Sequence, residues 1–317
     1  MTTGSNQPKS RHVLVTGGAG FIGANLVRLL LAKGWRVSVA DNLSSGPAVY
    51  IGGLDVELLD GDVLDREFVS SAVRGKDAIV HLAAQTGVPN SVAAPRRDFE
   101  VNAIGTLNVL EAARECGIGR FVFASSNAPL GRQAPPASED KAPLPISPYG
   151  ASKLTGEAYC LAYHGSWGLG TVILRFANVY GPYSGRKSSV VARFLGDIMS
   201  GNPITIYGGG NQTRDFVYVG DLCEAVSAAL DSPVSGEVLH IATGHPTSVR
   251  NLVDVMERVC GVRIERRFAP ERTADIGDNY SVVEKAKRLL GWEARTGLEE
   301  GLARTWQWFK AQHTNTA

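Results

Sequence analysis

Short apolar runs alternate with longer amphipathic stretches along the first half of the chain. The apolar runs predict strands at residues 12–15, 36–40, 78–82, 120–124 and 172–176. The amphipathic stretches predict helices at 23–33 and 102–115. Because the predicted strands are apolar on both faces, they are typical of a parallel sheet that helices cover on each side. Right-handed crossovers between such strands produce a doubly wound sheet.

Glycine and proline become more frequent after about residue 178, and the apolar runs become shorter. Such composition predicts loops at 178–182, 201–210 and 268–278. Helical patterns return at 217–232, 249–260 and 297–312. The chain is therefore predicted to be an α/β protein, with a Rossmann-type doubly wound parallel sheet and a smaller C-terminal α/β domain.

The same pattern predicts how the chain is divided. We expect a disordered tail at 1–10 and a first domain over 11–177, to which 215–242 returns. A second domain is expected from 178–214 and 243–317. The first is the expected cofactor-binding domain, and the second is the expected substrate-binding domain.

Composition and charge exclude several classes of partner. The chain is 44% hydrophobic and 20% charged, as in ordinary globular proteins. Lys and Arg number 32 against 31 Asp and Glu, so there is no basic excess for nucleic acid or an anionic membrane. No apolar run is long enough for a membrane span or a signal peptide, so a cytoplasmic protein is expected. The four cysteines are scattered, which favours free thiols and predicts no metal site.

A glycine-rich sequence follows the first predicted strand. In TGGAGFIG, Gly17, Gly20 and Gly23 stand three residues apart and open a predicted helix. The first glycine allows a tight turn, the second lets the backbone approach a pyrophosphate, and the third allows the helix to pack closely on the strand. The phosphates would lie at the helix N-terminus, where backbone N–H groups are free. A plain turn is the alternative, but the strand and the helix both agree with a dinucleotide site.

An acidic residue indicates which dinucleotide binds. Asp41 ends the second predicted strand, about 20 residues after the glycines, where a carboxylate accepts hydrogen bonds from the ribose hydroxyls and repels a 2′-phosphate. NAD is therefore predicted, with a cap or turn as the alternative role of Asp41. Asp62 is predicted to bind the adenine edge, unless it is a solvated turn residue. The other predicted NAD contacts are Phe21, Ile22, Asn42, Ser44, Val63, Leu82, Ala83, Ala84 and Asn102, together with Tyr149 and Lys153.

Three polar residues form a candidate catalytic group. Tyr149 and Lys153 stand four residues apart in SPYGASK, on one face of a helix. A nearby ammonium favours the phenolate, so Lys153 should lower the pKa of Tyr149. Tyr149 would then take the proton of a substrate hydroxyl while NAD takes the hydride. Ser126 ends the strand FVFASS, where its hydroxyl can orient the same oxygen.

These motifs resemble the extended short-chain dehydrogenase/reductase family, specifically its NAD-dependent sugar-nucleotide epimerases and dehydratases. The resemblance runs from about residue 12 to 309. It is carried by TGGAGFIG, DNLSSG, GDVLD, HLAAQ, VNAIGTLNVLEAA, SPYGASK, RFANVYGP, YGGGNQTRDFVYVGDL and LGWEARTGLEEGL. It implies a nucleoside-diphospho sugar, usually UDP-linked, that is oxidised at C4, and a tightly bound NAD that is regenerated in each cycle.

The resemblance also assigns substrate contacts. Ser126, Tyr149 and Lys153 match the family triad. Asn178, Arg214 and Arg272 match family residues that bind the diphosphate, although an ion pair with a neighbouring acid is the alternative for either arginine. The other expected substrate contacts are Ser126, Asn127, Tyr207 and Asn279. The family further implies a homodimer through the helices around 102–115 and 149–163.

The chain departs from its family after Ser126. Most relatives read S-S-x-x-V-Y-G, whereas this chain reads SSNAPLG, so Leu130 replaces the tyrosine. The 4,6-dehydratases carry an Asp-Glu pair at the positions of Asn127 and Ala128, which can act neither as acid nor as base. A 4,6-dehydratase is therefore not expected. A 4-epimerase needs only the triad and room for the keto sugar to turn over.

Two reactions remain open from the sequence. The SSNAPLG loop and the whole pattern look like those of the UDP-GlcNAc 5,6-dehydratases of tunicamycin biosynthesis, an antibiotic pathway, and this resemblance ranks that reaction first. After C4 oxidation such enzymes lose the C5 proton and the C6 hydroxyl, but the sequence names neither the base nor the acid. The alternative is 4-epimerisation of UDP-GlcNAc, UDP-GalNAc or UDP-glucose. Asn279 replaces a bulky tyrosine of hexose-specific epimerases, which favours an N-acetyl sugar. The intact triad argues against a non-catalytic NAD sensor.

Overall fold

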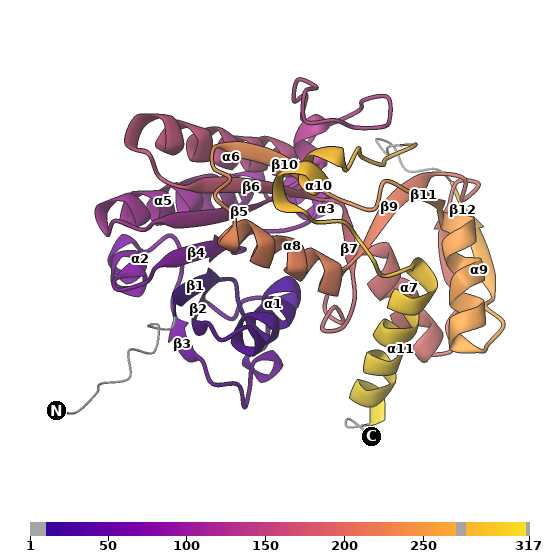
Figure 1. Ribbon diagram of the computed structural model, residues 1–317. Coiled ribbons are helices and arrows are strands. Elements are labelled where there is room, and N and C mark those ends of the chain that lie inside the picture. Colours follow the sequence, from indigo (N-terminus) through magenta and orange to yellow (C-terminus); the bar gives the residue numbers. More distant parts are fainter. Residues whose placement is uncertain (1–10, 271–276, 315–317) are drawn as a thin grey trace.

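The computed structural model describes residues 11–270 and 277–314 (Figure 1). Within these residues, seven strands form one sheet in the order β10-β6-β5-β4-β1-β2-β3, and every pairing is parallel. Its strands are β1 (His12–Thr16), β2 (Arg36–Asp41), β3 (Glu57–Asp60), β4 (Ala78–His81), β5 (Arg120–Ser126), β6 (Thr171–Phe176) and β10 (Glu237–Ile241). The predicted doubly wound parallel sheet is confirmed. Strand β3 was not predicted, because this edge strand is largely exposed and its sequence, ELLD, is not an apolar run.

Helices cover both faces of the sheet. They are α1 (Phe21–Ala32) and α8 (Val219–Asp231) on one face, and α2 (Arg66–Val73), α5 (Gly105–Glu115) and α6 (Pro148–Trp167) on the other. Alternate residues of β1 show why this strand is apolar throughout. Val13 and Val15 belong to the apolar core on the α1 and α8 side, whereas Leu14 belongs to the core on the α2, α5 and α6 side.

Short helical segments connect the main elements. They are the turns η1 (Ala48–Tyr50) and η3 (Ala128–Leu130), the helices α3 (Val88–Ala93) and α4 (Pro95–Phe99), and the π-helical turn η2 (Glu100–Ile104). The helix predicted at 102–115 therefore begins inside η2 and continues as α5. Asn102 lies within this π-turn, and single π-turns are often found at functional sites.

The second region carries smaller sheets and helices. Its elements are β7 (Asn178–Tyr180), α7 (Val190–Met199), β8 (Ile204–Tyr207), β9 (Thr213–Tyr218), β11 (Pro246–Ser248), α9 (Val249–Cys260), β12 (Arg266–Ala269), α10 (Glu284–Leu290) and α11 (Leu298–Thr314). Strands β11, β9 and β7 form one sheet, and β12 pairs with β8. The loops predicted at 178–182, 201–210 and 268–278 therefore contain β7, β8 and the end of β12. These strands have three or four residues, too few for an apolar pattern to show.

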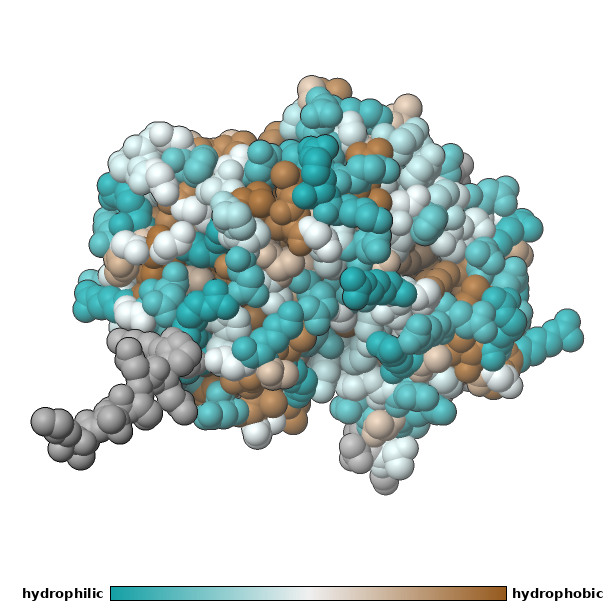
Figure 2. Space-filling model, viewed as in Figure 1, coloured by the Kyte–Doolittle hydropathy of each residue, from teal (hydrophilic) through white to brown (hydrophobic). Residues whose placement is uncertain are grey.

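The chain returns from the second region to the first. Strand β10 pairs with β6 over its whole length, and the helix predicted at 217–232 is the end of β9 followed by α8. The division into two domains stays a prediction, and the predicted tail at 1–10 lies outside the described residues. No described helix is long and apolar enough to cross a membrane. On the face in Figure 2, hydrophilic residues surround separate small apolar patches.

Candidate active site

A cleft of about 780 Å³ lies at the carboxyl ends of the central strands. One part is lined by the loops after β1, β2 and β4, and the other by the segment from Phe176 to Phe216. Ligands of open parallel sheets bind at this edge, where neighbouring crossovers diverge. The cleft therefore joins the glycine-rich loop to the second region.

The glycine-rich loop has the conformation that its spacing predicts. Gly17 has a φ of +70°, and a Cβ there would lie 2.7 Å from the backbone nitrogen of Ala83. A Cβ on Gly23 would collide with the backbone of Gly17 and Gly18. Helix α1 has no side-chain N-cap, and its first residues line the cleft. The free N–H groups of this turn suit a diphosphate.

Asp41 holds the turn after β2 and also lines the cleft, and its contact with the ribose stays a prediction. Its carboxylate accepts the N–H of Ala19 at 2.9 Å and that of Leu43 at 2.8 Å, so it shapes the turn. Burial raises its pKa. Each carboxylate oxygen has a second lone pair, and Asp41 lines the cleft, so it can also accept a ribose hydroxyl. Asp62 accepts hydrogen bonds from Asn42 and from the N–H of Leu64, both at 3.0 Å.

The predicted cofactor contacts fall into two groups. Those that line the cleft are Gly17, Gly20, Phe21, Ile22, Gly23, Asp41, Asn42, Ser44, Asp62, Val63, Leu82, Ala83, Ala84, Tyr149 and Lys153. Asn102 is buried behind the cleft wall instead. Its side chain accepts the N–H of Gln85 at 2.8 Å and donates to the carbonyl of Gln85 at 3.0 Å. Asn102 therefore positions the turn after β4 without lining the cleft.

A buried polar chain that the sequence did not reveal supports the same turn. His81 Nδ1 lies 2.7 Å from the hydroxyl of Thr16, and its Nε2 lies 3.0 Å from that of Thr106. Thr106 donates to the carbonyl of Asn102 at 2.6 Å. Burial lowers the pKa of His81 to about 3, so the imidazole is neutral. The only signal in the sequence was a histidine at the end of an apolar strand.

The candidate catalytic residues meet where the two parts of the cleft join. Ser126 ends β5 and is hydrogen-bonded to Tyr149, and both line the cleft with Lys153. Helix α6 begins at Pro148, and Ser147 caps it by accepting the N–H of Gly150 at 3.1 Å. This start places Tyr149 and Lys153 in the first two turns, on one face.

The pKa values differ from what the spacing predicts. Burial raises the pKa of Tyr149 to about 12, and the hydrogen bond with Ser126 acts in the opposite direction. Burial lowers the pKa of Lys153 to about 8, although Asp98 favours its charge. The predicted lowering of the phenol pKa by Lys153 is therefore not found. The ammonium donates to the carbonyl of Ala124 at 2.9 Å, and burial dominates at Tyr149.

A model of the NAD-dependent epimerase/dehydratase family matches residues 13–242. The chain belongs to this family. It is 36% identical over 308 residues to the UDP-glucose 4-epimerase of Mycolicibacterium smegmatis, with 94% of this chain and 98% of that protein covered.

Two solved structures of the family have the same fold. The UDP-glucose 4-epimerase of Thermus thermophilus, in complex with NAD, matches with a TM-score of 0.88 at 38% identity, over 94% of this chain and 99% of that one. The dTDP-glucose 4,6-dehydratase DesIV of Streptomyces venezuelae, with NAD and TYD bound, matches with a TM-score of 0.90 at 31% identity, over 96% of this chain and 98% of that one. Family membership confirms the predicted fold and NAD as the cofactor.

Only some of the predicted substrate contacts lie together in the cleft. Ser126, Asn178, Tyr207 and Arg214 line the cleft. Arg214 donates to the carbonyls of Thr213 and Gly277, at 2.7 and 3.1 Å. Arg272 lies outside the described residues.

Two of the predicted contacts lie elsewhere. Asn127 donates to Ser281 at 3.0 Å, and its carbonyl oxygen lies 2.9 Å from Nδ1 of His240, because η3 turns the chain away from the cleft. Asn279 lines a separate small hollow with Asn127 and Tyr280. Neither residue is among the described residues of the cleft wall, so the argument for an N-acetyl sugar from Asn279 has no structural support.

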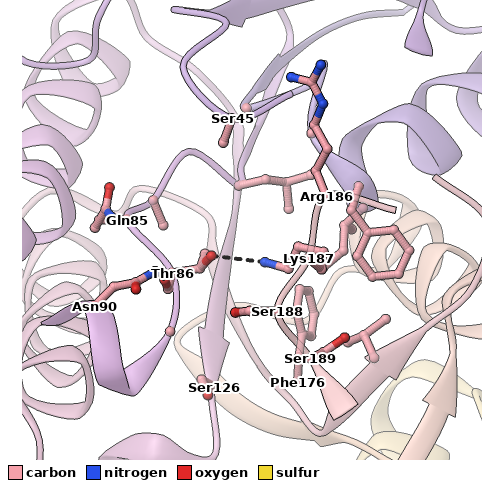
Figure 3. Close-up of a pocket in the computed structure, with 18 of the residues that line it drawn as sticks. Ser45, Gln85, Thr86, Asn90, Ser126, Phe176, Arg186, Lys187, Ser188 and Ser189 are labelled. Carbon is pink, nitrogen blue, oxygen red and sulfur yellow. Dashed lines mark hydrogen bonds between the residues drawn. The ribbon is translucent and has the colours of Figure 1, made fainter. Parts of the chain in front are cut away.

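The sequence also missed the segment at 184–189, which we call the strap. It follows β7 and lines the cleft opposite Gln85, Thr86 and Asn90 (Figure 3). Lys187 of the strap donates to the hydroxyl of Thr86, at 2.9 Å, on the loop after β4. The sequence signal, RKSS after a Gly-Pro turn, marked only a loop, and nothing local showed what it would face.

Proposed function

We propose that this protein is a UDP-sugar 4-epimerase. The observation that carries the proposal is the composition of the reacting end of the cleft. It holds Ser126, Tyr149 and Lys153, but the carboxylates among the described lining residues are Asp41 and Asp62, at the predicted adenosine end. Epimerisation needs proton and hydride transfer at a single carbon, which the triad and the cofactor supply. The similarity to UDP-glucose 4-epimerases supports the same reaction.

Proton transfer in this reaction belongs to Tyr149. Its phenolate takes the proton of the C4 hydroxyl, while the Ser126 hydroxyl hydrogen-bonds to the same oxygen. The glycine-rich loop and Asp41 would hold NAD, which would supply a reversible hydride acceptor for C4 and a positive nicotinamide charge that favours the phenolate. After the keto sugar has turned over, Tyr149 returns the proton to the C4 oxygen. The products therefore differ from the substrate only in configuration at C4.

Several contacts keep Tyr149 and Ser126 in place. Ser126 accepts the N–H of Ala128 at 3.2 Å, and Lys153 binds the carbonyl of Ala124 in the same strand. Asp98 accepts the hydroxyl proton of Ser152 at 2.6 Å, between the two catalytic residues of α6. Because Ala124, Asp98 and Ser152 are buried, these contacts preorganise the reacting groups, as proton transfer requires.

The 5,6-dehydration that the sequence ranked first is the less well supported reaction. It needs a base for the C5 proton and an acid for the C6 hydroxyl. Asn127 is bound to His240 and Ser281, and Ala128 has no titratable group. No observation on the described residues favours the tunicamycin-type reaction, which stays a prediction.

The two reactions are separated by the mass of the product. The NAD-loaded protein is incubated with UDP-glucose and with UDP-GlcNAc, and the products are analysed by mass spectrometry and NMR. Unchanged mass with inverted C4 supports the epimerase. Loss of one water with vinylic signals would instead establish the dehydratase. The Tyr149→Phe variant should abolish either product and serves as the control.

We further propose a homodimer through α3, α4, η2 and α6. These neighbouring elements expose large apolar side chains, namely Val92, Phe99, Ile104, Tyr159 and Leu161. An exposed apolar group of this kind is typical of a protein interface. Light scattering after size-exclusion chromatography should give twice the chain mass. Phe99→Glu should produce the monomer, and a monomeric wild-type protein would refute the proposal.

A further inference from the structure

The strap holds a lysine across the reacting end of the cleft. The N–H of Lys187 donates to the carbonyl of Ser184 at 2.8 Å, and the hydroxyl of Ser184 donates to the carbonyl of Gly181 at 2.7 Å. Nearby, the ring of Tyr183 packs on those of Tyr50 and Trp308, with centroids 5.3 and 5.4 Å apart. The backbone of the strap is therefore fixed by its own turn and by aromatic packing, so the position of Lys187 is defined before a ligand binds.

The ammonium of Lys187 has a neutral partner. Among the described residues its hydrogen bond goes to the hydroxyl of Thr86, and no described carboxylate lies within ion-pair distance of it. Lys187 is half-buried, and burial lowers its pKa. Lys187 and Lys153 line the same cleft, and the pKa of Lys153 is lowered mainly by burial and also by the charge of Lys187. A partly buried cation without a counter-charge is unfavourable until an anion reaches it.

The carboxylates near the cleft are already engaged and lie elsewhere. Asp41 ends β2 and Asp62 lies in the loop after β3, and each accepts a hydrogen bond from a backbone N–H. Asp98 lies behind Lys153, where it is bonded to Ser152 and Asn102. The residues labelled around Lys187 in Figure 3 include no carboxylate: beside the apolar Phe176 and a second cation, Arg186, they are the neutral polar residues Ser45, Gln85, Thr86, Asn90, Ser126, Ser188 and Ser189. The described wall of the cleft therefore supplies no counter-charge for Lys187.

The phosphates of the two ligands have other partners in the proposed site. Those of NAD suit the N-terminus of α1, and those of UDP suit Arg214. Lys187 points at Thr86 instead, and it lines the same cleft as Ser126 and Tyr149 (Figure 3). An ammonium and an adjacent hydroxyl can together hold one carboxylate, the ammonium as a charge and the hydroxyl as a second donor.

We propose that Lys187 and Thr86 form a subsite for a carboxylate on the sugar ring, so that the preferred substrate is a UDP-hexuronic acid. The inference rests on the proposed 4-epimerase function and names its substrate class. Lys187 acts as a specificity-determining residue. It takes no part in the proton or hydride transfer at C4, which stays with Tyr149, Ser126 and the cofactor.

The test compares UDP-glucuronic acid with UDP-glucose on the NAD-loaded protein. The wild type should show the higher kcat/KM with UDP-glucuronic acid. Lys187→Met should raise KM for this substrate by about 10- to 100-fold, the usual loss with a charge-assisted hydrogen bond, and leave KM for UDP-glucose within about 3-fold. Lys187→Arg should retain the preference. The matched control is Arg186→Met, which removes the exposed neighbouring cation of the strap and should leave the preference unchanged.

Calorimetry separates this inference from the proposed function. The ratio of the two binding constants is measured on the same variants without turnover, and the NAD content after desalting is measured in parallel. Equal affinity of the wild type for both nucleotides, or an equal loss of both in Lys187→Met, would overturn the inference. A loss of bound NAD in Lys187→Met would overturn it as well, because the lysine would then serve the cofactor. If neither sugar is epimerised, the proposed function fails, and the ratio of binding constants still decides the role of Lys187.

Discussion

The two parts of the cleft present different chemical groups to their ligands. On the side of β1 and β2, glycines bring the backbone close, and carboxylates such as Asp41 hold N–H groups within the turns. On the side of β7 to β9, long cationic side chains line the cleft, such as Lys187 of the strap and Arg214 of β9. A ligand that binds to backbone N–H groups requires glycine at particular positions. A ligand that binds to long side chains requires only that a charged residue lies within reach. The first kind of site therefore leaves a pattern in the sequence, and the second leaves very little.

The largest effect is expected where the two parts meet. Tyr149→Phe should lower kcat by about 10²- to 10⁴-fold, because the proton of the sugar hydroxyl then has no acceptor. NAD content and melting temperature should stay close to the wild-type values. Tyr159→Phe, an exposed tyrosine on the same helix, is the matched control and should keep full activity. Full activity of Tyr149→Phe would remove this residue from the mechanism.

Glycine replacements test how far the part of the cleft at β1 and β2 depends on close backbone contacts. Gly17 and Gly34 both have positive φ, of +70° and +81°, but a Cβ contacts Ala83 only at Gly17, since nothing lies within 4 Å at Gly34. Gly34→Ala should cost about 1 kcal/mol through backbone strain alone. Gly17→Ala should cost about 2–4 kcal/mol and should also lower the NAD content. Urea unfolding and the absorbance of released cofactor measure the two effects. Equal behaviour of the variants would mean that the close approach to Ala83 is unimportant.

Acid should weaken both parts through buried histidines. His81 lies beneath the β4 turn and His240 beneath the Asn127 loop, and burial lowers the pKa of each to about 3. In the unfolded chain their ordinary value is 6.5, so the unfolded state binds protons that the folded state does not. Stability therefore falls as the pH decreases from about 6.5 toward 3, by about 1.4 kcal/mol for each histidine at pH 5.5.

The contribution of each histidine can be separated. Urea unfolding at pH 7.5 and 5.5 should show a smaller difference in His81→Asn and in His240→Asn than in the wild type. If both variants lose as much stability between pH 7.5 and 5.5 as the wild type does, other groups cause the acid sensitivity.

The smallest effect on turnover is expected at Asn127. Because its side chain binds His240 and Ser281, Asn127→Ala should change kcat and KM by less than about 3-fold while costing about 1–3 kcal/mol of stability. Asn178→Ala is the comparison, because Asn178 lines the cleft and its loss should raise KM for the sugar nucleotide. A large loss of turnover in Asn127→Ala would mean that Asn127 contacts the substrate, as the sequence predicted.

The part of the site that could be predicted depends on local chemistry. Gly17 and Gly23 were recognised because only glycine permits their backbone contacts, and Tyr149 and Lys153 because four-residue spacing on a helix fixes their relation. The central strands were recognised because both faces are buried.

The rest depends on contacts between distant segments. Asn127 meets His240 across 113 positions of the chain, and Lys187 meets Thr86 across 101, so no local pattern shows either contact. The pKa of Tyr149 was predicted in the wrong direction, because burial depends on the packing of the whole cleft wall. Strands β7 and β8 were missed because three or four residues show no periodicity.

The late return of β10 to the sheet has a consequence for synthesis on the ribosome. Strand β6 ends at Phe176, but its partner β10 is not complete until Ile241. While the intervening segment emerges from the exit tunnel, the edge of β6, Thr171–Phe176, has no partner strand. Its backbone N–H and C=O groups are unpaired on that side, and its side chains, which are buried in the folded protein, are exposed. Such an edge is a template for pairing with another chain. Nascent chains stalled between β6 and β10 are therefore the ones expected to recruit chaperones or to aggregate.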